Sequence, residues 1–302
     1  RAGARFLVPG DPEWPEGVDD LSRLAAEPLG LWVRGPLDVR VTAARAVSLV
    51  GSRSASGYGQ HVAGELAAQL ADRGWAVVSG GAYGVDGAAH RGALAAGGGT
   101  VAVMANGIDV HYPRGHEALL RRIADDGLLL TELPPGCAPQ RHRFLTRNRV
   151  IAALGAGTVV VEAGLRSGAR STAGHSAKLG RPTMAVPGPV TSATSAGCHV
   201  LLRGGATLVT RAAEVVEEVG RLGLDLAPDQ RGPVGWRDAL SESVRRVLDA
   251  VPVGSAAGPA QIARVAGVDQ LTVLRSLGPL EREGLVVADV GGYRQTARAR
   301  AR

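Results

Sequence analysis

Short apolar runs alternate with helical stretches through the middle of this 302-residue chain, and this alternation limits the folds it can adopt. Strands separated by helices pair in parallel, with helices on both faces of the sheet. The first helical stretch has an apolar face at Val62, Leu66 and Leu70 and ends at Gly74. The sequence therefore predicts an α/β fold with a doubly wound, mostly parallel sheet. The predicted strands are residues 46–50, 75–79, 100–105, 127–131, 158–162, 183–186 and 207–210.

The turn after the first of these strands reads V-G-S-R and precedes a helical pattern. The loops after parallel strands gather at one edge of the sheet, and a helix start offers backbone N–H groups to an anion. Gly51 allows a close approach, while Ser52, Ser54 and Arg53 supply donors for a phosphate. The spacing is neither G-x-G-x-x-G nor a P-loop, which disfavours dinucleotides and nucleoside triphosphates. The alternative is that Gly51 only makes the turn.

The stretch 140–155 has the strongest positive charge in the chain. Arginines neutralise a phosphate backbone and an aromatic ring stacks on bases, so this pattern is typical of a groove for single-stranded nucleic acid. The alternative is a solvated helix end in which the phenylalanine anchors the core. The candidate binding residues here are Arg143, Phe144, Arg147, Asn148 and Arg149, with Arg141 in the same run.

A second strand-to-helix turn, at 166–173, combines arginines with hydroxyl groups. It repeats the pattern of an anion site at a helix start. Ser167, Gly168 and Arg170 are the candidate contacts in this turn, and Lys178, two helical turns further on, extends the basic track.

The charge balance fits an acidic partner without identifying it. Lys and Arg number 34 against 28 Asp and Glu, which gives a net charge of +6 and a pI near 10.1. Nearly all the basic residues are arginines, for which a GC-rich genome is the simpler explanation. Cys137 and Cys198 fit no metal spacing and no disulfide framework, and no apolar run is long enough for a membrane span. We expect a cytoplasmic protein with no cofactor and no membrane association. The sequence begins with Arg1 rather than Met, as in a chain that lacks an N-terminal piece.

Six motifs occur in order along residues 9–219. They are V-G-S-R at 50–53, S-G-G-A-Y-G-V-D-G-A-A-H at 79–90, L-L-T-E-L-P-P-G at 129–136, F-L-T-R-N-R-V-I-A at 144–152, V-V-E-A-G-L-R-S-G at 160–168 and A-V-P-G at 185–188. In these motifs the chain resembles the DNA-processing protein A family, also called DprA or Smf. This resemblance implies an extended Rossmann-like domain that binds single-stranded DNA, forms a homodimer, protects incoming DNA and loads RecA recombinase in natural transformation. The family's contact positions correspond to Ser52, Arg53, Phe144, Arg147, Asn148, Arg149, Ser167 and Gly168.

The chain departs from the family pattern at three places. Tyr83 and His199 replace an arginine and an asparagine that are common there, and residues 167–172 read S-G-A-R-S-T instead of S-G-S-L-I-T. Arg170 could thus add a phosphate contact in place of a lost serine.

Four titratable residues near these loops raise the alternative of a nucleotide-cleaving enzyme of related fold. The P-G-G-x-G-T pattern of such enzymes is absent from the sequence, so we expect no catalysis and interpret the four as hydrogen-bonding residues that hold loops. They are Asp86, His90, Glu132 and Glu162.

The remaining segments flank the main domain. Residues 1–42 are expected to pack on the Rossmann-like domain at 43–220, with a helix at 19–26 and a strand at 29–34. Residues 221–236 read as a linker. Residues 237–302 predict three helices and a hairpin, hence a winged helix with a basic tail, whose third helix is interrupted at Gly278-Pro279. A duplex-DNA contact and a protein contact both stay open for this domain, with protein contact favoured.

Overall fold

The structure is a computed structural model that describes residues 3–221, 223–229 and 235–300. The described residues fall into two compact units, divided between Pro228 and Asp229. Each unit has its own hydrophobic core. Positions 222 and 230–234 of the predicted linker, and 301–302 of the predicted basic tail, lie outside the described residues.

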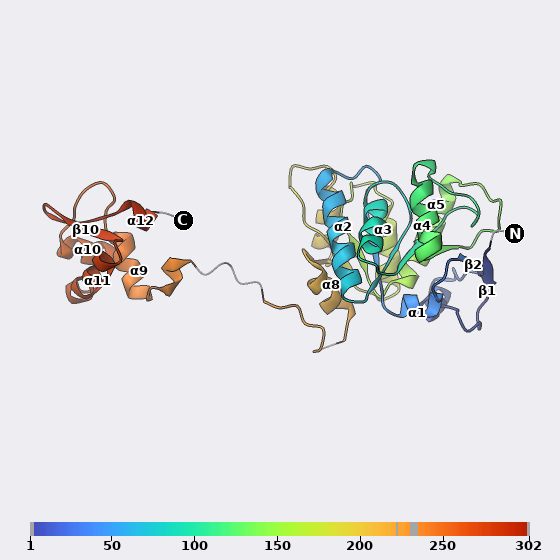
Figure 1. The fold of residues 1–302 in the computed structure, drawn as a ribbon, viewed down its shortest axis with the longest axis horizontal. Helices are drawn as coiled ribbons and strands as arrows, with labels where there is room; N and C mark the ends of the chain where they lie inside the picture. The colour runs from blue at the N-terminus through green and yellow to red at the C-terminus, as the bar shows by residue number, and fades with distance from the viewer. Residues whose placement is uncertain (1–2, 222, 230–234, 301–302) are drawn as a thin grey trace. The chain divides into compact units, whose positions relative to one another are not determined.

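The first unit is built on a nine-stranded sheet in the order β1-β2-β6-β5-β4-β3-β7-β8-β9 (Figure 1). Neighbouring strands from β6 through β9 in this order are parallel, which confirms the predicted doubly wound sheet. All seven predicted strands are present, each within a few residues of its predicted ends. The strands are β1 (Arg5–Leu7), β2 (Leu31–Arg34), β3 (Ala46–Val50), β4 (Ala76–Ser79), β5 (Thr100–Val103), β6 (Leu128–Thr131), β7 (Thr158–Val160), β8 (Thr183–Ala185) and β9 (Thr207–Leu208).

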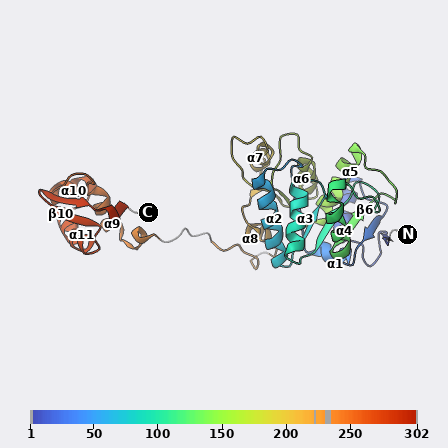
Figure 2. The ribbon, with the colours of Figure 1, turned by 45° about the horizontal axis from the view of Figure 1, so that its top comes forward.

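Helices cover both faces of this sheet. Strand residues alternate between the faces, so that Leu49 packs in the core cluster with Leu66 while Val50 packs with Ile151 on the other side. One face carries α2 (Gly57–Asp72), α3 (Val85–Ala95), α4 (Glu117–Asp126) and α8 (Ala212–Val219), of which α2, α3 and α4 lie side by side in Figures 1 and 2. The other carries the 3₁₀ helix η1 (Glu16–Leu24), α5 (Arg141–Leu154), α6 (Ala169–Lys178) and α7 (Ala196–Arg203).

The strand order reverses at β3, and this reversal positions the candidate site. The chain passes from β3 to β4, β5 and β6 on one side and then returns to place β7 on the other side of β3. In open α/β sheets, the loops that follow the two neighbouring strands at such a reversal, here β3 and β7, run in opposite directions and leave a crevice between them. The turns after β3 and β7 are the two that carry the predicted anion sites.

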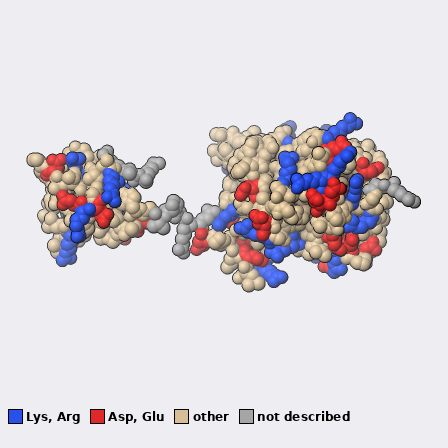
Figure 3. Space-filling model, viewed as in Figure 1, with Lys and Arg blue, Asp and Glu red and all other residues tan. Residues whose placement is uncertain are grey.

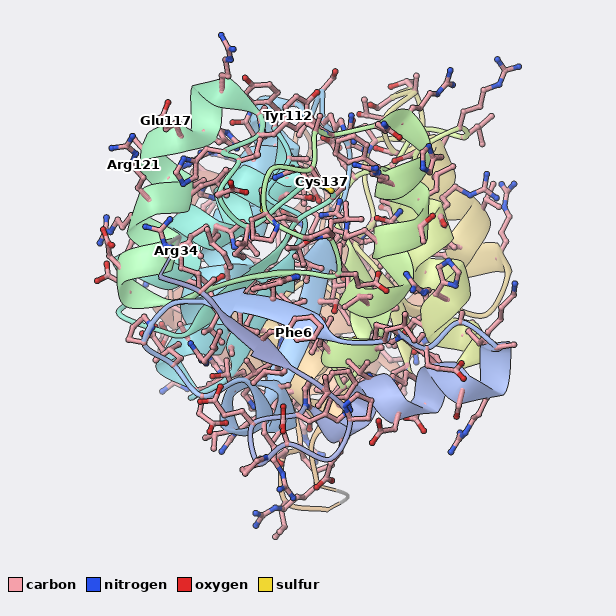
Figure 4. All side chains as sticks on the ribbon, turned by 90° about the vertical axis from the view of Figure 1, so that its right-hand side faces the viewer. Phe6, Arg34, Tyr112, Glu117, Arg121 and Cys137 are labelled. Carbon is pink, nitrogen blue, oxygen red and sulfur yellow. The ribbon has the colours of Figure 1, made fainter. Side chains whose placement is uncertain are left out.

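The segment before β3 is part of the sheet as well as a cover for it. β1 pairs antiparallel with β2, and β2 pairs antiparallel with β6. Figure 4 faces this edge of the sheet and shows Phe6 and Arg34 on it. The predicted helix of this segment is the 3₁₀ helix η1, and the short helix α1 (Val39–Ala44), capped by Asp38, was not predicted. β2 lies within the predicted strand 29–34, whereas β1, which has only three residues, was not predicted.

The second unit contains the three predicted helices and the predicted hairpin. The helices are α9 (Glu242–Ala250), α10 (Pro259–Ala266) and α11 (Gln270–Arg282), and the hairpin strands are β10 (Val286–Asp289) and β11 (Gly292–Gln295). A 3₁₀ turn, η3 (Trp236–Ala239), precedes them, and α12 (Ala297–Arg300) follows. The expected interruption of the third helix is wrong, because α11 continues through Pro279. Burial of Leu277 and Leu280 on either side of the proline holds the helix against the core. The winged-helix assignment stays a prediction.

Burial of His90 on α3 makes the stability of the first unit depend on pH. The ring is fully buried, with Nδ1 2.8 Å from Oγ1 of Thr100, and burial lowers its pKa from 6.5 to about 3. Because the pKa of His90 is lower in the folded state than in the unfolded state, only the unfolded state takes up a proton as the pH falls below about 6.5. The folded state therefore loses stability over this range. We expect this group to remove about 2 kcal/mol of unfolding free energy between pH 6.5 and 5.

Urea unfolding at a series of pH values measures this effect. The His90→Gln protein should lack this share of the pH dependence, because the amide does not titrate. Equal slopes in the two proteins would contradict the assignment.

Candidate nucleic-acid interface

A groove of about 900 Å³ lies at the edge of the sheet where the strands end. Five segments that follow β3, β4, β5, β6 and β7 contribute to its walls, as predicted for an open α/β sheet. Its polar and charged lining comes from Ser52, Arg53, Ser54, Asp86, Tyr112, Arg141, Arg147, Asn148, Arg166, Ser167 and Thr172.

The turn after β3 is held tightly at Gly51. A Cβ atom there would lie 2.5 Å from a Val85 methyl group and 2.8 Å from the carbonyl oxygen of Glu162, so a side chain would not fit. The next N–H, of Ser52, donates to that same carbonyl at 2.7 Å. The glycine therefore makes the turn, and it also lines the groove beside Arg53; its contact with a phosphate stays a prediction.

The start of α2 is not the open anion site that the sequence predicted. The helix begins at Gly57, capped by Ser56, and the carboxylate of Glu162 occupies its N-terminal end. Glu162 accepts hydrogen bonds from the backbone N–H of Ser56 at 2.8 Å, its hydroxyl at 2.7 Å and Thr194 Oγ1 at 2.9 Å. The protein's own carboxylate satisfies the helix end, so any phosphate held by this loop must use the Ser52–Ser54 side of it.

One face of α5 lines the groove. Arg141, Phe144, Leu145 and Asn148 recur at the spacing of a single helical face, and all four contact the cavity. The alternative interpretation of Phe144 as a core anchor is disfavoured, because its ring is only partly buried and belongs to the groove lining.

Two predicted binding residues of α5, Arg143 and Arg149, do not line the groove. Arg149 forms a two-pronged ion pair with Glu132 at 2.5 and 2.7 Å and donates to the carbonyl of Ala26. Arg143 donates to the carbonyl of Ala138 at 2.6 Å. Both guanidinium groups already bond to protein groups, so this geometry does not favour their assignment to the DNA-binding set, which stays a prediction.

Arg147 lines the floor of the groove but is buried, with 7% of its surface exposed. Its Nη1 donates to the carbonyls of Gly80 (2.9 Å) and Val103. Burial lowers its pKa to about 10, although the nearby Asp86 carboxylate opposes that shift. Asp86 in turn has a raised pKa, because burial outweighs the attraction of Arg147 and the N–H groups of Gly80 and Ala82. The two residues form a buried framework under the groove.

The turn after β7 supplies the opposite wall. Ser167, Gly168 and Thr172 line the groove at the start of α6, and Nδ2 of Asn148 donates to the carbonyl of Gly168 at 3.2 Å. Asn148 therefore ties α5 to this turn. Arg166 beside it is exposed and lines the groove.

Two residues predicted for the second turn fall elsewhere. Arg170 donates to the carbonyl of Leu165 and does not line the groove, so its contact in place of the lost serine stays a prediction that this geometry does not favour. Lys178 ends α6 and lies about 14 Å along the helix from its start. The basic track does not continue that far.

Among the groove residues that are absent from the predicted binding set are Arg141, Arg166 and Tyr112. Helical periodicity could have selected Arg141, which lies three residues before Phe144. Tyr112 comes from the long segment after β5, where the sequence carries no periodic signal. Figure 4 shows Tyr112 near the top of the view, above Cys137 and Phe6.

The four titratable residues considered for catalysis all make hydrogen bonds, as predicted, although His90 joins a helix to a strand and holds no loop. Asp86 and Glu162 accept backbone N–H groups, Glu132 pairs with Arg149, and His90 contacts Thr100. Among the residues the structure describes, no three His, Cys, Asp or Glu side chains are grouped as a metal site would require. Within the same ranges, no helix has both the length and the apolar character of a membrane span.

The groove differs in charge from the face of the first unit that carries α2, α3 and α4. Figure 3 shows basic and acidic side chains intermingled over the face that carries α2, α3 and α4. In the groove, by contrast, Arg53, Arg141 and Arg166 are exposed, and in the described part of the chain none of the three is seen in a hydrogen bond or ion pair with a protein group. Unpaired guanidinium groups on a concave surface attract a polyanion.

Comparisons with known proteins agree with this geometry. The model of the family described as DNA recombination-mediator protein A matches residues 5–220. A putative DNA processing protein DprA of Mycobacterium tuberculosis is 52% identical over 302 residues, which cover 97% of this chain and 77% of that protein. The crystal structure of DprA from Streptococcus pneumoniae has a TM-score of 0.67 at 37% identity, covering 72% of this chain and 75% of that one. A structure of DNA processing protein A from Helicobacter pylori, described for its single-stranded DNA binding mode, has a TM-score of 0.63 at 28% identity, covering 72% and 96%.

Proposed function

Because this chain belongs to the DNA recombination-mediator protein A family, we propose that it binds single-stranded DNA in the groove between the β3 and β7 turns. One observation carries the proposal: three exposed arginines, Arg53, Arg141 and Arg166, line one cavity together with a partly buried phenylalanine ring. Phosphates pair with guanidinium groups, and bases stack on aromatic rings. The relative from Helicobacter pylori, whose structure was described for its single-stranded DNA binding mode, supports this choice of ligand.

The protein is a binder and not an enzyme in this proposal. The carboxylates near the groove already accept hydrogen bonds from the protein, and Glu162 has three such donors. A general acid or base must reach a proton on its substrate. Release of free base from nucleoside monophosphates, lost in the Glu162→Ala protein, would contradict this part of the proposal.

The proposed role extends to recombination. A recombination mediator brings a recombinase onto single-stranded DNA, so we propose that the protein protects incoming DNA and loads RecA recombinase onto it. We also propose that it acts as a homodimer through the first unit. The description of the family supports the recombinase role.

The salt dependence of DNA binding tests the groove. Each phosphate contact adds about 0.7 to the slope of log K against log salt for a single strand. We expect Arg53→Ala, Arg141→Ala and Arg166→Ala each to weaken binding to oligo(dT) and to reduce this slope by about 0.7. Fluorescence anisotropy between 50 and 300 mM salt, in the range where such slopes are measured, provides both numbers.

Arg73→Ala is the matched control. This exposed arginine ends α2, at the opposite end of the helix from the groove, and donates to the carbonyl of Gln69. Its affinity and slope should equal those of the unmodified protein. Three groove variants that all behave like this control would overturn the proposed site.

A further inference from the structure

Two side chains from different segments, Arg53 and Tyr112, both contact the ring of Phe144 in the groove. Cζ of Arg53 lies 4.6 Å from the ring centroid of Phe144, and the ring centroid of Tyr112 lies 5.7 Å from that of Phe144. The three residues come from the turn after β3, from α5 and from the segment after β5. All three line the same cavity.

Tyr112 contributes neither to the hydrophobic core nor, among the described residues, to a side-chain hydrogen bond. Its side chain is 38% exposed and belongs to none of the hydrophobic core clusters. Within the described residues, its hydroxyl is not seen in a hydrogen bond. By comparison, Tyr58, which is similarly exposed, donates its hydroxyl hydrogen to the carbonyl of Pro187. A large ring that neither fills the core nor anchors a loop, yet faces a basic groove, is available to a ligand.

The two rings are not parallel. Their planes meet at 50°, so a single flat base cannot stack on both. Each ring can instead hold its own base, and the two bases must then be inclined to each other. Successive bases of a duplex are stacked in parallel and cannot adopt this arrangement, whereas the unstacked bases of a single strand can be splayed onto separate rings.

We propose that Tyr112 is a second base-stacking residue of the groove, which holds a nucleobase next to the one on Phe144 and so selects single-stranded over duplex DNA. This inference rests on the proposed function and adds a base contact to it. Arg53, whose guanidinium lies over Phe144, either stacks with the bound base or turns to a phosphate. The contact is to the flat face of the base and is therefore independent of sequence.

Comparing two ligands separates this base contact from backbone contacts. The ligands are oligo(dT) and an oligomer of the same length made only of abasic sugar-phosphate units. Removing one stacking ring typically costs about 5- to 150-fold in affinity. We expect Tyr112→Leu to bind oligo(dT) that much more weakly and to bind the abasic oligomer as the unmodified protein does. The salt slope should not change, because no phosphate contact is lost.

Tyr112→Phe and Tyr58→Leu are the controls. Tyr112→Phe keeps the ring and should bind both ligands normally, while Tyr58→Leu removes an equally exposed tyrosine that does not line the groove. Phe144→Ala should show the same pattern as Tyr112→Leu. Normal binding of the abasic oligomer also shows that a variant is folded.

The outcomes distinguish this inference from the proposed function. If Tyr112→Leu binds oligo(dT) normally while Arg53→Ala and Arg141→Ala lose affinity, the groove is still supported as the DNA-binding site, but the proposed base stacking by Tyr112 is wrong. The same holds if the unmodified protein binds both ligands equally, or if Tyr112→Leu weakens both equally. If the arginine variants bind normally, the proposed site itself fails.

Discussion

Replacing Arg147 with alanine should lower the free energy of unfolding by about 3–5 kcal/mol, the usual cost of removing one member of a buried charged group. The guanidinium donates to the carbonyls of Gly80 and Val103, which would lose a donor inside the protein. Asp86 would lose the positive charge that favours its ionised form. Urea unfolding at neutral pH measures the effect.

The loss should also depend on pH. Burial already raises the pKa of Asp86 above its unfolded value, and without Arg147 the pKa rises further. An acid with a raised folded pKa destabilises the fold as the pH rises through that pKa, so the cost of Arg147→Ala should be larger at pH 8 than at pH 5.

Arg141→Ala is the matched control for this prediction. It removes an exposed arginine from the same helix and should weaken DNA binding without changing stability. A loss below about 1 kcal/mol for Arg147→Ala, within the range of ordinary surface substitutions, would contradict the assignment of Arg147 to the buried framework.

Replacing Arg181 with alanine should be about as costly. Its guanidinium donates to the carbonyls of Ala152, Ala153 and Gly155 at the end of α5, and it also bonds to Gly17 and Asp20 in the N-terminal segment. The side chain is 14% exposed, so water replaces few of these bonds. We expect a loss of about 3–5 kcal/mol, measured by urea unfolding.

Arg23→Ala provides an internal comparison, because Arg23 pairs with the same carboxylate. It lies 3.1 Å from Asp20, but its side chain is 68% exposed. A pair of this kind contributes about 0–1 kcal/mol. Similar losses in the two variants would mean that the ion pair, and not the bonds to the carbonyls, accounts for the role of Arg181.

The sheet could be predicted because its signal is local. Each parallel strand is a short apolar run, and the alternation of strands with helices determines how they are wound. The antiparallel edge could not be predicted in the same way. β1 has three residues and β2 has four, and their pairing depends on where β6 lies.

The site shows a similar limit. The sequence identified the two turns and α5, but it assigned Arg147 and Arg149 to DNA binding and left Arg141 out of the binding set. Arg149 pairs with Glu132, 17 residues earlier, and Arg147 bonds to a carbonyl 67 residues earlier. Only the tertiary structure separates these two from Arg141, which faces the groove. The start of α2 was misjudged for the same reason, because its carboxylate partner lies 106 residues further along the chain.

That internal carboxylate has a consequence for competition inside the cell. In many folds of this type, the N-terminal end of the first helix binds the phosphate group of a small metabolite. Here the carboxylate of Glu162 occupies the N-terminal end of α2, so a mononucleotide phosphate would meet negative charge there instead of free N–H groups. Abundant nucleotides such as ATP would then bind weakly at that helix start. The affinity for a long strand would be less affected, because the strand distributes its charge over many separate contacts.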